Sequence, residues 1–407
     1  MTGNRHLPAA TTSAVIMALL PLMAAVLVVF LITGLAIPVL PLHVHEGLGL
    51  STFVVGLVTG TQFGASLISR VWSGHYADTR GAKRAVIAGL LAASASGILY
   101  LLSLWFVATP ITSATILLLG RALLGGAESF IVTGALSWGL AVVTPQNSGK
   151  VIAWIGTAMY AAFAVGAPIG TAFYLAHGFF AIALATAIVP LAVVPFILSL
   201  RGVAALPRNQ PSLATVLGTV SLPGLGLSLS SLGFGAITTF STLLFVGRGW
   251  APVWIALTGF TTAFMVTRIA LGHLPDKMGG AKVALVSILV EAAGLALIWV
   301  APWAGLAFAG AVLTGVGYAL VYPGLGLEAV RYVPDQSRGL AMGTYTAFFD
   351  MGVGVSSPVL GVIAGHASLG AVFLASALVV LGAAPIAARL FFAGQAPAGT
   401  GGGRVPR

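Results

Sequence analysis

Long apolar stretches recur along the whole chain and constrain its fold more than any other feature. A helix needs about 20 mostly apolar residues to cross a hydrocarbon core about 30 Å thick. Cutting the sequence at charges, polar clusters and Gly/Pro turns leaves twelve such stretches, with approximate limits 16–42, 53–74, 84–107, 112–142, 151–176, 178–200, 214–245, 252–273, 282–300, 304–331, 339–365 and 369–392. Backbone groups in lipid need internal hydrogen bonds, and these stretches lack the period-two alternation of barrel strands. The sequence therefore predicts an all-α integral membrane protein with twelve transmembrane helices.

The composition excludes the main alternatives to a membrane protein. Charged residues make up 6% of the 407 residues, whereas a soluble domain carries about 25%. Intrinsic disorder requires low hydrophobicity, but 58% of this chain is hydrophobic. The sequence has no cysteine, which excludes disulfides and thiolate metal sites. The first apolar run is longer than the apolar core of a signal peptide, so we expect it to be the first helix.

The basic residues predict how the chain is oriented. With a cytoplasmic N-terminus, 14 of the 18 Lys and Arg residues fall in inner segments and one, Arg248, falls in an outer loop. The inner residues are Arg5, Arg80, Lys83, Arg84, Lys150, Arg201, Arg208, Lys277, Lys282, Arg331, Arg338, Arg389, Arg404 and Arg407. The positive-inside rule accordingly places both termini in the cytoplasm. Because this charge is spread over seven short segments, the net charge of +10 does not indicate nucleic-acid binding.

Two segments of the chain repeat the pattern R-x3-G-H-x2-D-x2-G. The first begins at Arg70 and the second at Arg268, and each lies at the inner end of the second helix of a six-helix half. The repeat predicts a tandem duplication into two pseudo-symmetric, parallel six-helix bundles. We expect the N-terminal bundle at 1–200, a cytoplasmic linker at 201–212, the C-terminal bundle at 213–393 and a flexible tail at 394–407.

Several motifs resemble those of the major facilitator superfamily of secondary transporters. The segment Gly74-x3-Asp78-x2-Gly81-x-Lys83-Arg84 resembles a loop signature of this superfamily, although Thr79 stands where a basic residue is usual. Arg121-x3-Gly125-Gly126 resembles a second signature. Gly156, followed by Gly166-Ala-Pro168-Ile-Gly170, resembles the motif of proton-coupled antiporters. The runs Tyr322 to Arg331 and Ala347 to Gly354 are similar to a bacterial subgroup of sugar (arabinose) efflux or drug-resistance permeases.

The resemblance implies a function and a location for the chain. We expect a secondary active transporter in the bacterial plasma (inner) membrane, which exports a small organic solute by proton antiport and alternating access. A proton-coupled sugar importer and a uniporter are the nearest alternatives. The expected substrate is uncharged or weakly charged, either a sugar or an amphipathic drug. We expect a monomer in the bilayer, with no cofactor and with the proton gradient as its energy source.

Other classes of membrane protein have less support in the sequence. An integral-membrane enzyme requires a clustered nucleophile, metal site or acid pair, and the seven scattered His residues supply none. An ATP-driven pump requires a nucleotide-binding domain, but no G-x4-G-K-[ST] motif occurs. A channel stays open as an alternative, although two pseudo-symmetric halves favour rocking around a central site.

Charged residues inside the expected spans are the strongest candidates for a mechanism, because each costs at least about 2.5–3.5 kcal/mol at a helix centre. The resemblance places Glu128 and Asp350 at a central cavity, in opposite halves. Burial favours the protonated carboxyl, so we expect one or both to carry the coupling proton. The alternative is a permanently neutral or Arg-paired acid that holds helices together. Arg121 lies on the same helix face as Glu128, about 10 Å away along the axis, and is expected to bind an anionic substrate or modulate Glu128. The alternative is a snorkelling or paired cation.

The repeated segment also supplies candidate gate residues. A carboxylate can cap the positive N-terminal end of a helix. The resemblance places Asp78 at the start of helix eleven and Asp276 at the start of helix five, across the interface between the halves. The gating set comprises Gly74, Asp78, Gly81, Arg84, Asp276 and Gly279. The alternative is a pair of solvated loop turns.

The remaining candidates are polar or helix-shaping residues. Expected cavity groups, each equally able to join two helices, are Thr33, Gln62, Tyr160, Tyr318, Tyr322 and Tyr345. Expected kink or close-packing residues are Gly166, Pro168, Gly170 and Pro358. Glu291 and Glu328 are expected to be mainly structural. His43-x-His45-Glu46 is expected on an outer loop, where it makes a weak candidate for a metal site.

Overall fold

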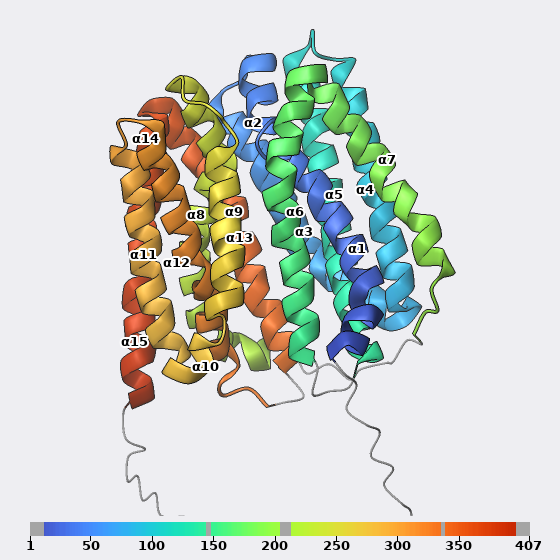
Figure 1. Cartoon of the computed structure of the whole chain (residues 1–407), viewed down its shortest axis with the longest axis vertical. Helices are drawn as coiled ribbons and strands as arrows, with labels where there is room; N and C mark the ends of the chain where they lie inside the picture. Colours follow the sequence, from blue (N-terminus) through green and yellow to red (C-terminus); the bar gives the residue numbers. More distant parts are fainter. Residues whose placement is uncertain (1–11, 144–147, 204–212, 335–337, 396–407) are drawn as a thin grey trace, which may run out of the picture.

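The computed structural model describes residues 12–143, 148–203, 213–334 and 338–395, and every regular element in these ranges is helical. In this part of the chain, eleven helices are long and apolar enough to cross a membrane, and Ile255–Leu271 is a shorter apolar helix. The long helices run side by side along one axis (Figure 1). The prediction of an all-α membrane protein is confirmed.

The first helices along the chain pack mainly on one another. Contacts join α1 to α6, α3 to α5, and α4 to both α5 and α7. They form the blue-to-green group in Figure 1. The group comprises α1 (Thr12–Ala36), α2 (Leu40–Leu42), the π-helical turn η1 (His43–Gly47), α3 (Thr52–Arg80), α4 (Ala82–Leu104), α5 (Pro110–Val142), α6 (Ser148–His177) and α7 (Phe179–Ser199).

The later helices form a second group, coloured yellow-green to red in Figure 1. Contacts join α11 to α12, α13 to α8, and α12 to α9. The group comprises α8 (Leu213–Gly247), α9 (Ile255–Leu271), α10 (Leu274–Met278), α11 (Gly280–Val300), α12 (Ala304–Val330), α13 (Arg338–His366), α14 (Leu369–Leu381) and α15 (Ala384–Gln395). The exact bundle limits stay a prediction, because most of the expected linker and nearly all of the expected tail lie outside the described residues.

Helix ends differ from the expected ones where helices continue into polar residues. The second span is predicted to stop at Gly74, but α3 continues to Arg80, so Gly74 and Asp78 are helical and their description as loop residues is wrong. The backbone N–H of Gly81 still donates to the Ala77 carbonyl at 3.1 Å, which closes the last turn. A hydropathy pattern detects the apolar core of a helix but not the hydrogen bonds that extend it.

Two further expectations about helix ends need correction. The segment that contains His43 and His45 forms the π-helical turn η1, so its placement on a loop is wrong. The last span divides into α14 and α15 instead of forming one helix. By contrast, the expected breaks near Gly178 and near Pro302-Trp303 separate α6 from α7 and α11 from α12.

The backbone shows the internal repeat at two glycines. Gly81 follows α3 with a φ of 95°, and Gly279 follows α10 with a φ of 93°. This region favours glycine because a side chain would collide with the backbone there. Each glycine directly precedes the next long helix, α4 or α11. The same backbone turn at equivalent positions of the two repeated segments supports a tandem duplication.

Close approach of α3 and α5 depends on one of two adjacent glycines. A Cβ on Gly125 would overlap the backbone carbonyl of Gln62, whereas a Cβ on Gly126 would have its nearest neighbour, Ser69, at 4.0 Å. We expect Gly125→Ala to lower the stability of the protein by about 1–3 kcal/mol through overpacking. Gly126→Ala is the matched control and should change stability little. Thermal unfolding of the purified variants in detergent measures the difference, and equal melting temperatures would contradict the prediction.

Candidate functional site

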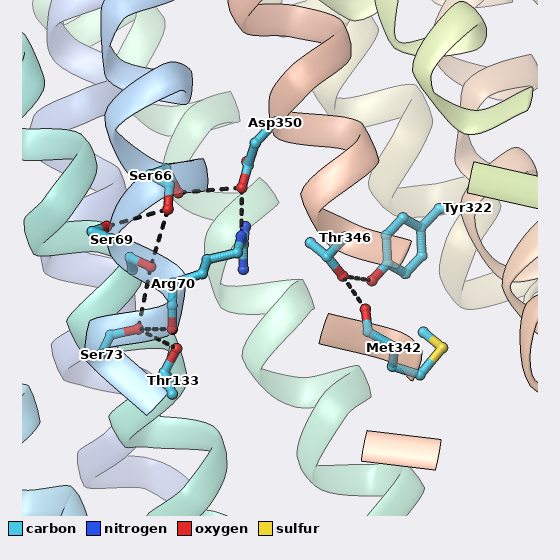
Figure 2. A network of polar contacts seen from close by, with 10 residues as sticks. Ser66, Ser69, Arg70, Ser73, Thr133, Tyr322, Met342, Thr346 and Asp350 are labelled. Carbon is cyan, nitrogen blue, oxygen red and sulfur yellow. Dashed lines mark hydrogen bonds and ion pairs between the residues drawn. The ribbon is translucent and has the colours of Figure 1, made fainter. Parts of the chain in front are cut away.

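An ion pair joins the two helix groups inside the membrane-spanning part of the molecule. The Nε of Arg70, on α3, donates to the Oδ2 of Asp350, on α13 (Figure 2). The Asp350 side chain is 3% exposed and that of Arg70 is 25% exposed. Two opposite charges thus neutralise each other at the α3–α13 contact, which is an interface between the groups.

Hydroxyl groups continue from this ion pair along α3 and α5. The Ser66 hydroxyl donates to Asp350 Oδ2 at 3.4 Å, and the Ser129 hydroxyl donates to the Ser66 carbonyl at 3.5 Å. Ser73 lies 3.4 Å from Ser129 and 3.2 Å from the Thr133 hydroxyl (Figure 2). The α3–α5 contact is therefore polar on the side of Asp350 and Arg70.

Glu128, on α5, is the second buried acid of the site. Its Oε1 accepts a hydrogen bond of 2.6 Å from the Thr33 hydroxyl of α1, and its Oε2 accepts one of 2.7 Å from the Gln62 amide of α3. Ser66 lies one turn after Gln62 on α3. Glu128 and Asp350 therefore accept hydrogen bonds from side chains on neighbouring turns of the same helix. Thr33, Gln62 and Glu128, three candidates from the sequence analysis, therefore form one hydrogen-bonded cluster.

Arg121 is buried without contacting Glu128 directly. Its side chain is 1% exposed, and its Nε and Nη1 have no hydrogen-bond partner among the described residues. The separation along α5 agrees with the expected spacing of nearly two turns. Polar atoms buried without a partner are costly, so Arg121 is a strong candidate for contact with a polar solute.

The four candidate tyrosines occupy two places. Tyr160 of α6 stacks on Phe264 of α9 at 3.7 Å between ring centroids, so it lies between the groups. Tyr318 is buried in the second group, 3.4 Å from the Ser231 hydroxyl. The Tyr345 hydroxyl donates to the Tyr322 carbonyl at 2.9 Å. The last two contacts join helices of the same group.

Tyr322 has two further contacts. Its hydroxyl lies 2.6 Å from that of Thr346 (Figure 2). The Arg268 guanidinium lies over its ring, 5.8 Å from the centroid. Arg268 and Arg70 occupy equivalent positions of the sequence repeat, but Arg70 contacts an acid and Arg268 an aromatic ring. The two halves therefore use the same repeated position differently.

The gating residues lie at the end of the molecule where α3 and α10 end. Asp276 is exposed on α10 and lines a cavity of about 400 Å³ with Glu328, Arg331 and Arg338, all in the second group. Asp78 lies in the last turns of α3, and Arg84 is exposed near the start of α4. The expected contact of Asp276 with helix five involves side chains outside the described ones. Both cross-interface gate contacts stay predictions.

The helix-shaping candidates are at helix contacts. A Cβ on Gly166 or on Gly170 would collide with backbone atoms of α1, at Gly34 and Leu35 respectively. Pro168 is inside α6. Pro358 is inside α13 and faces Gly56 and Gly60 of α3. These residues bring helices close together within the first group and between the groups.

The other buried acids lie away from the site. Glu291 of α11 is fully buried and accepts a hydrogen bond from the Ser230 hydroxyl of α8. Glu328 accepts the Ala281 N–H at 3.2 Å, which caps α11, and pairs with Arg331 at 3.2 Å. Among the described residues, no group of three His, Cys, Asp or Glu side chains could hold a metal ion.

Two basic residues with defined contacts have no assigned role in the sequence analysis. Arg70 is the partner of Asp350. Lys83 donates to the Leu198 and Leu200 carbonyls at 2.7 and 2.6 Å, where a cation complements the negative end of α7. Two sequence signals mark Arg70: it is a charge inside an expected span, and it lies four residues before the repeated Gly74.

The two groups are in close contact between the start of α3 and Asp350. The Thr52 hydroxyl, at the start of α3, donates to the Gly361 carbonyl of α13 at 2.7 Å. Next along the contact, a Cβ on Gly56 would overlap the Ser357 backbone. The groups are thus pressed together between the Thr52 end and the ion pair.

Comparison with known proteins places this architecture in a family. The model of the Major Facilitator Superfamily matches residues 22–279 and 224–405. An uncharacterised MFS-type transporter of Salmonella typhimurium (strain LT2) is 39% identical over 381 residues, which covers 93% of this chain and 98% of the relative. A similarly named transporter of Burkholderia pseudomallei (strain 1106a) is 40% identical over 351 residues, 86% of each chain.

Solved structures share the fold at low sequence identity. A bacterial homologue of the human lysosomal transporter Spinster has a TM-score of 0.70 at 14% identity and covers 95% of this chain and 98% of its own. The nucleoside transporter NupG has a TM-score of 0.68 at 14% identity, with coverages of 92% and 99%. The Escherichia coli fucose:proton symporter FucP has a TM-score of 0.63 at 14% identity, with coverages of 92% and 99%. The chain therefore belongs to the major facilitator superfamily, and it is a multi-pass membrane transporter rather than an enzyme.

Proposed function

We propose that this transporter is a proton antiporter that exports a small organic solute by alternating access. The observation that carries the proposal is the Arg70–Asp350 ion pair, which joins the two helix groups at a buried position. A proton on Asp350 removes the negative charge that holds Arg70. Protonation therefore weakens one contact between the groups, and deprotonation restores it. An ion pair at this position couples a proton to the relative movement of the two groups.

Glu128 is the second proton carrier in this proposal, and Arg121 contacts the solute. The Thr33 and Gln62 donors stabilise the charged form of Glu128, because both donate to its oxygen atoms. A proton on Glu128 changes this arrangement, because the carboxyl then donates to the Thr33 hydroxyl, which donates to the Val29 carbonyl. Arg121 has buried nitrogen atoms without described partners. In this proposal these nitrogen atoms donate hydrogen bonds to a polar group of the solute.

The described conformation corresponds to a state closed on the outer side. The Thr52 end of α3 follows the first expected outer loop, and the groups are in close contact there. With both termini cytoplasmic, the opposite end faces the cytoplasm of a bacterial cell. Solute enters from that end, and protons that enter from outside drive the return of the empty carrier.

The test uses everted membrane vesicles acidified inside by respiration. Arabinose, benzoate and dodecyldimethylamine represent a sugar, an organic acid and an amphipathic weak base. We expect one of them to cause proton release that exceeds the release from vesicles lacking the protein. Solute accumulation should then collapse when a protonophore removes the gradient. Accumulation that is unchanged by the protonophore would contradict proton antiport. Protonophore-insensitive uptake that stops at equal solute concentrations on both sides would support a uniporter.

A further inference from the structure

A groove lies between α3 and α13, with Asp350 among its lining residues. Its volume is about 230 Å³. Its walls are apolar, and Asp350 is its one charged lining residue. The lining residues are Leu57, Gly60, Thr61, Gly64, Leu67, Asp350, Met351, Gly354 and Val355.

The groove exists because glycines line the contact between the two helices. Gly60 and Gly354 allow the backbones of α3 and α13 to approach each other. A Cβ on Gly64 would meet no atom within 4 Å, so the space beside this residue is open. The sequence thus leaves both a tight helix contact and an adjoining hollow.

The groove opens on the surface that faces lipid. On α13, Val355 is 63% exposed and Met351 is 37% exposed. On α3, Ile68 follows the groove residue Leu67 and is 62% exposed. Large apolar side chains exposed on membrane-spanning helices lie against acyl chains. An apolar molecule dissolved in the bilayer can therefore reach the groove without crossing water.

The chemistry at the base of the groove selects what can bind there. Arg70 and Ser66 both donate to Oδ2 of Asp350, and none of the described residues donates to Oδ1. A carboxylate oxygen in an apolar surrounding attracts a cationic hydrogen-bond donor. Apolar walls next to one carboxylate match a molecule with an alkyl body and a single protonated amine.

We propose that this groove is a lateral binding site for lipophilic amines, which reach Asp350 directly from the bilayer. The amine competes with Arg70 for the carboxylate, as a proton does. The assignment of these compounds as substrates rests on the proposed antiport, whereas their binding in the groove does not. The ligand class is an amphipathic weak base.

The experiment is photolabelling of the full chain in lipid nanodiscs, without any ion gradient. The probe is a dodecyldimethylamine that carries a diazirine in its alkyl chain, and the reference probe is the corresponding dodecanol. Peptide mass spectrometry locates the labels. We expect the amine to label the segments 57–67 and 351–355 about fivefold more than the alcohol does, the factor that one partly exposed ion pair supplies.

Two kinds of variant test the site. Gly64→Leu fills the groove and should abolish labelling of both segments, and Gly64→Ala should reduce it by a smaller factor. Gly218→Leu is the matched control, because Gly218 of α8 also has open space around a Cβ but lies far along the chain from the groove. Asp350→Asn should remove the preference for the amine while leaving the alcohol labels unchanged.

Two results would overturn the inference: equal labelling by amine and alcohol, or undiminished labelling of both Gly64 variants. Because no gradient is present, the labelling does not depend on proton coupling. Labelling in the groove without solute-driven proton release would contradict the antiport proposal alone. Solute-driven proton release without labelling in the groove would contradict this site alone.

Discussion

Asp350→Asn is expected to abolish solute-driven proton release in everted vesicles, to the level of vesicles that lack the protein. The substitution keeps the shape of the side chain but removes the carboxyl that binds the proton and pairs with Arg70. Expression and membrane insertion should remain. Glu46→Gln is the matched control, because Glu46 is an exposed acid on η1, and it should retain transport.

The Asp350 variant also tests whether the acid is only structural. The substitution leaves Arg70 unpaired, and we expect this to cost up to about 3 kcal/mol of stability. This value is the lower end of the range for buried pairs, because 25% of the Arg70 side chain is exposed. The double variant Arg70→Gln, Asp350→Asn removes both charges and should recover much of this stability. It should not recover proton release. Recovery of proton-linked transport in the double variant would show that Asp350 only balances Arg70.

Glu128→Gln is expected to reduce solute-driven proton release at least about tenfold, the effect of a barrier higher by about 1.4 kcal/mol. Glutamine has one carbonyl oxygen, so it cannot accept from both Thr33 and Gln62 as the carboxylate does. Loss of one such hydrogen bond costs about 1 kcal/mol of stability, which leaves the protein folded.

The conservative variant separates proton binding from packing at Glu128. Glu128→Asp keeps an ionisable group but shortens the side chain by one methylene. We expect it to retain measurable proton release, with weaker solute accumulation than the native chain. If Glu128→Gln and Glu128→Asp had the same residual activity, geometry rather than ionisation would explain the loss. Full proton-linked transport in both Glu128→Gln and Asp350→Asn would refute the assignment of the two carriers.

The helices were predictable because their cause is local. Each needs only a run of apolar residues long enough for the bilayer, and the turn at Gly178 interrupts two such runs with a φ of 67°. The ends were less predictable, as α3 shows by continuing to Arg80. Polar residues at the membrane surface extend a helix through backbone hydrogen bonds that no hydropathy pattern reveals.

The sequence identified most residues of the site but not which of them contact each other. Asp350 is recognisable as a charge inside an apolar span, and so is Arg70. Their pairing joins residues 280 positions apart, and no local pattern relates them. Likewise, Thr33, Gln62 and Glu128 each stand out as polar residues on different helices, but their convergence depends on how those helices cross.

The sequence by itself determined the membrane location, the helical class and the tandem repeat, because apolar length, charge distribution and motif spacing are properties of the chain alone. Only the tertiary structure decided which buried charges meet. That outcome depends on helix rotation and on close approaches at glycines such as Gly125, where the absence of a Cβ sets the distance between α3 and α5. The equivalent positions of Arg70 and Arg268 show the difference: Arg70 forms an ion pair with an acid of the other half, whereas Arg268 contacts the Tyr322 ring of its own half.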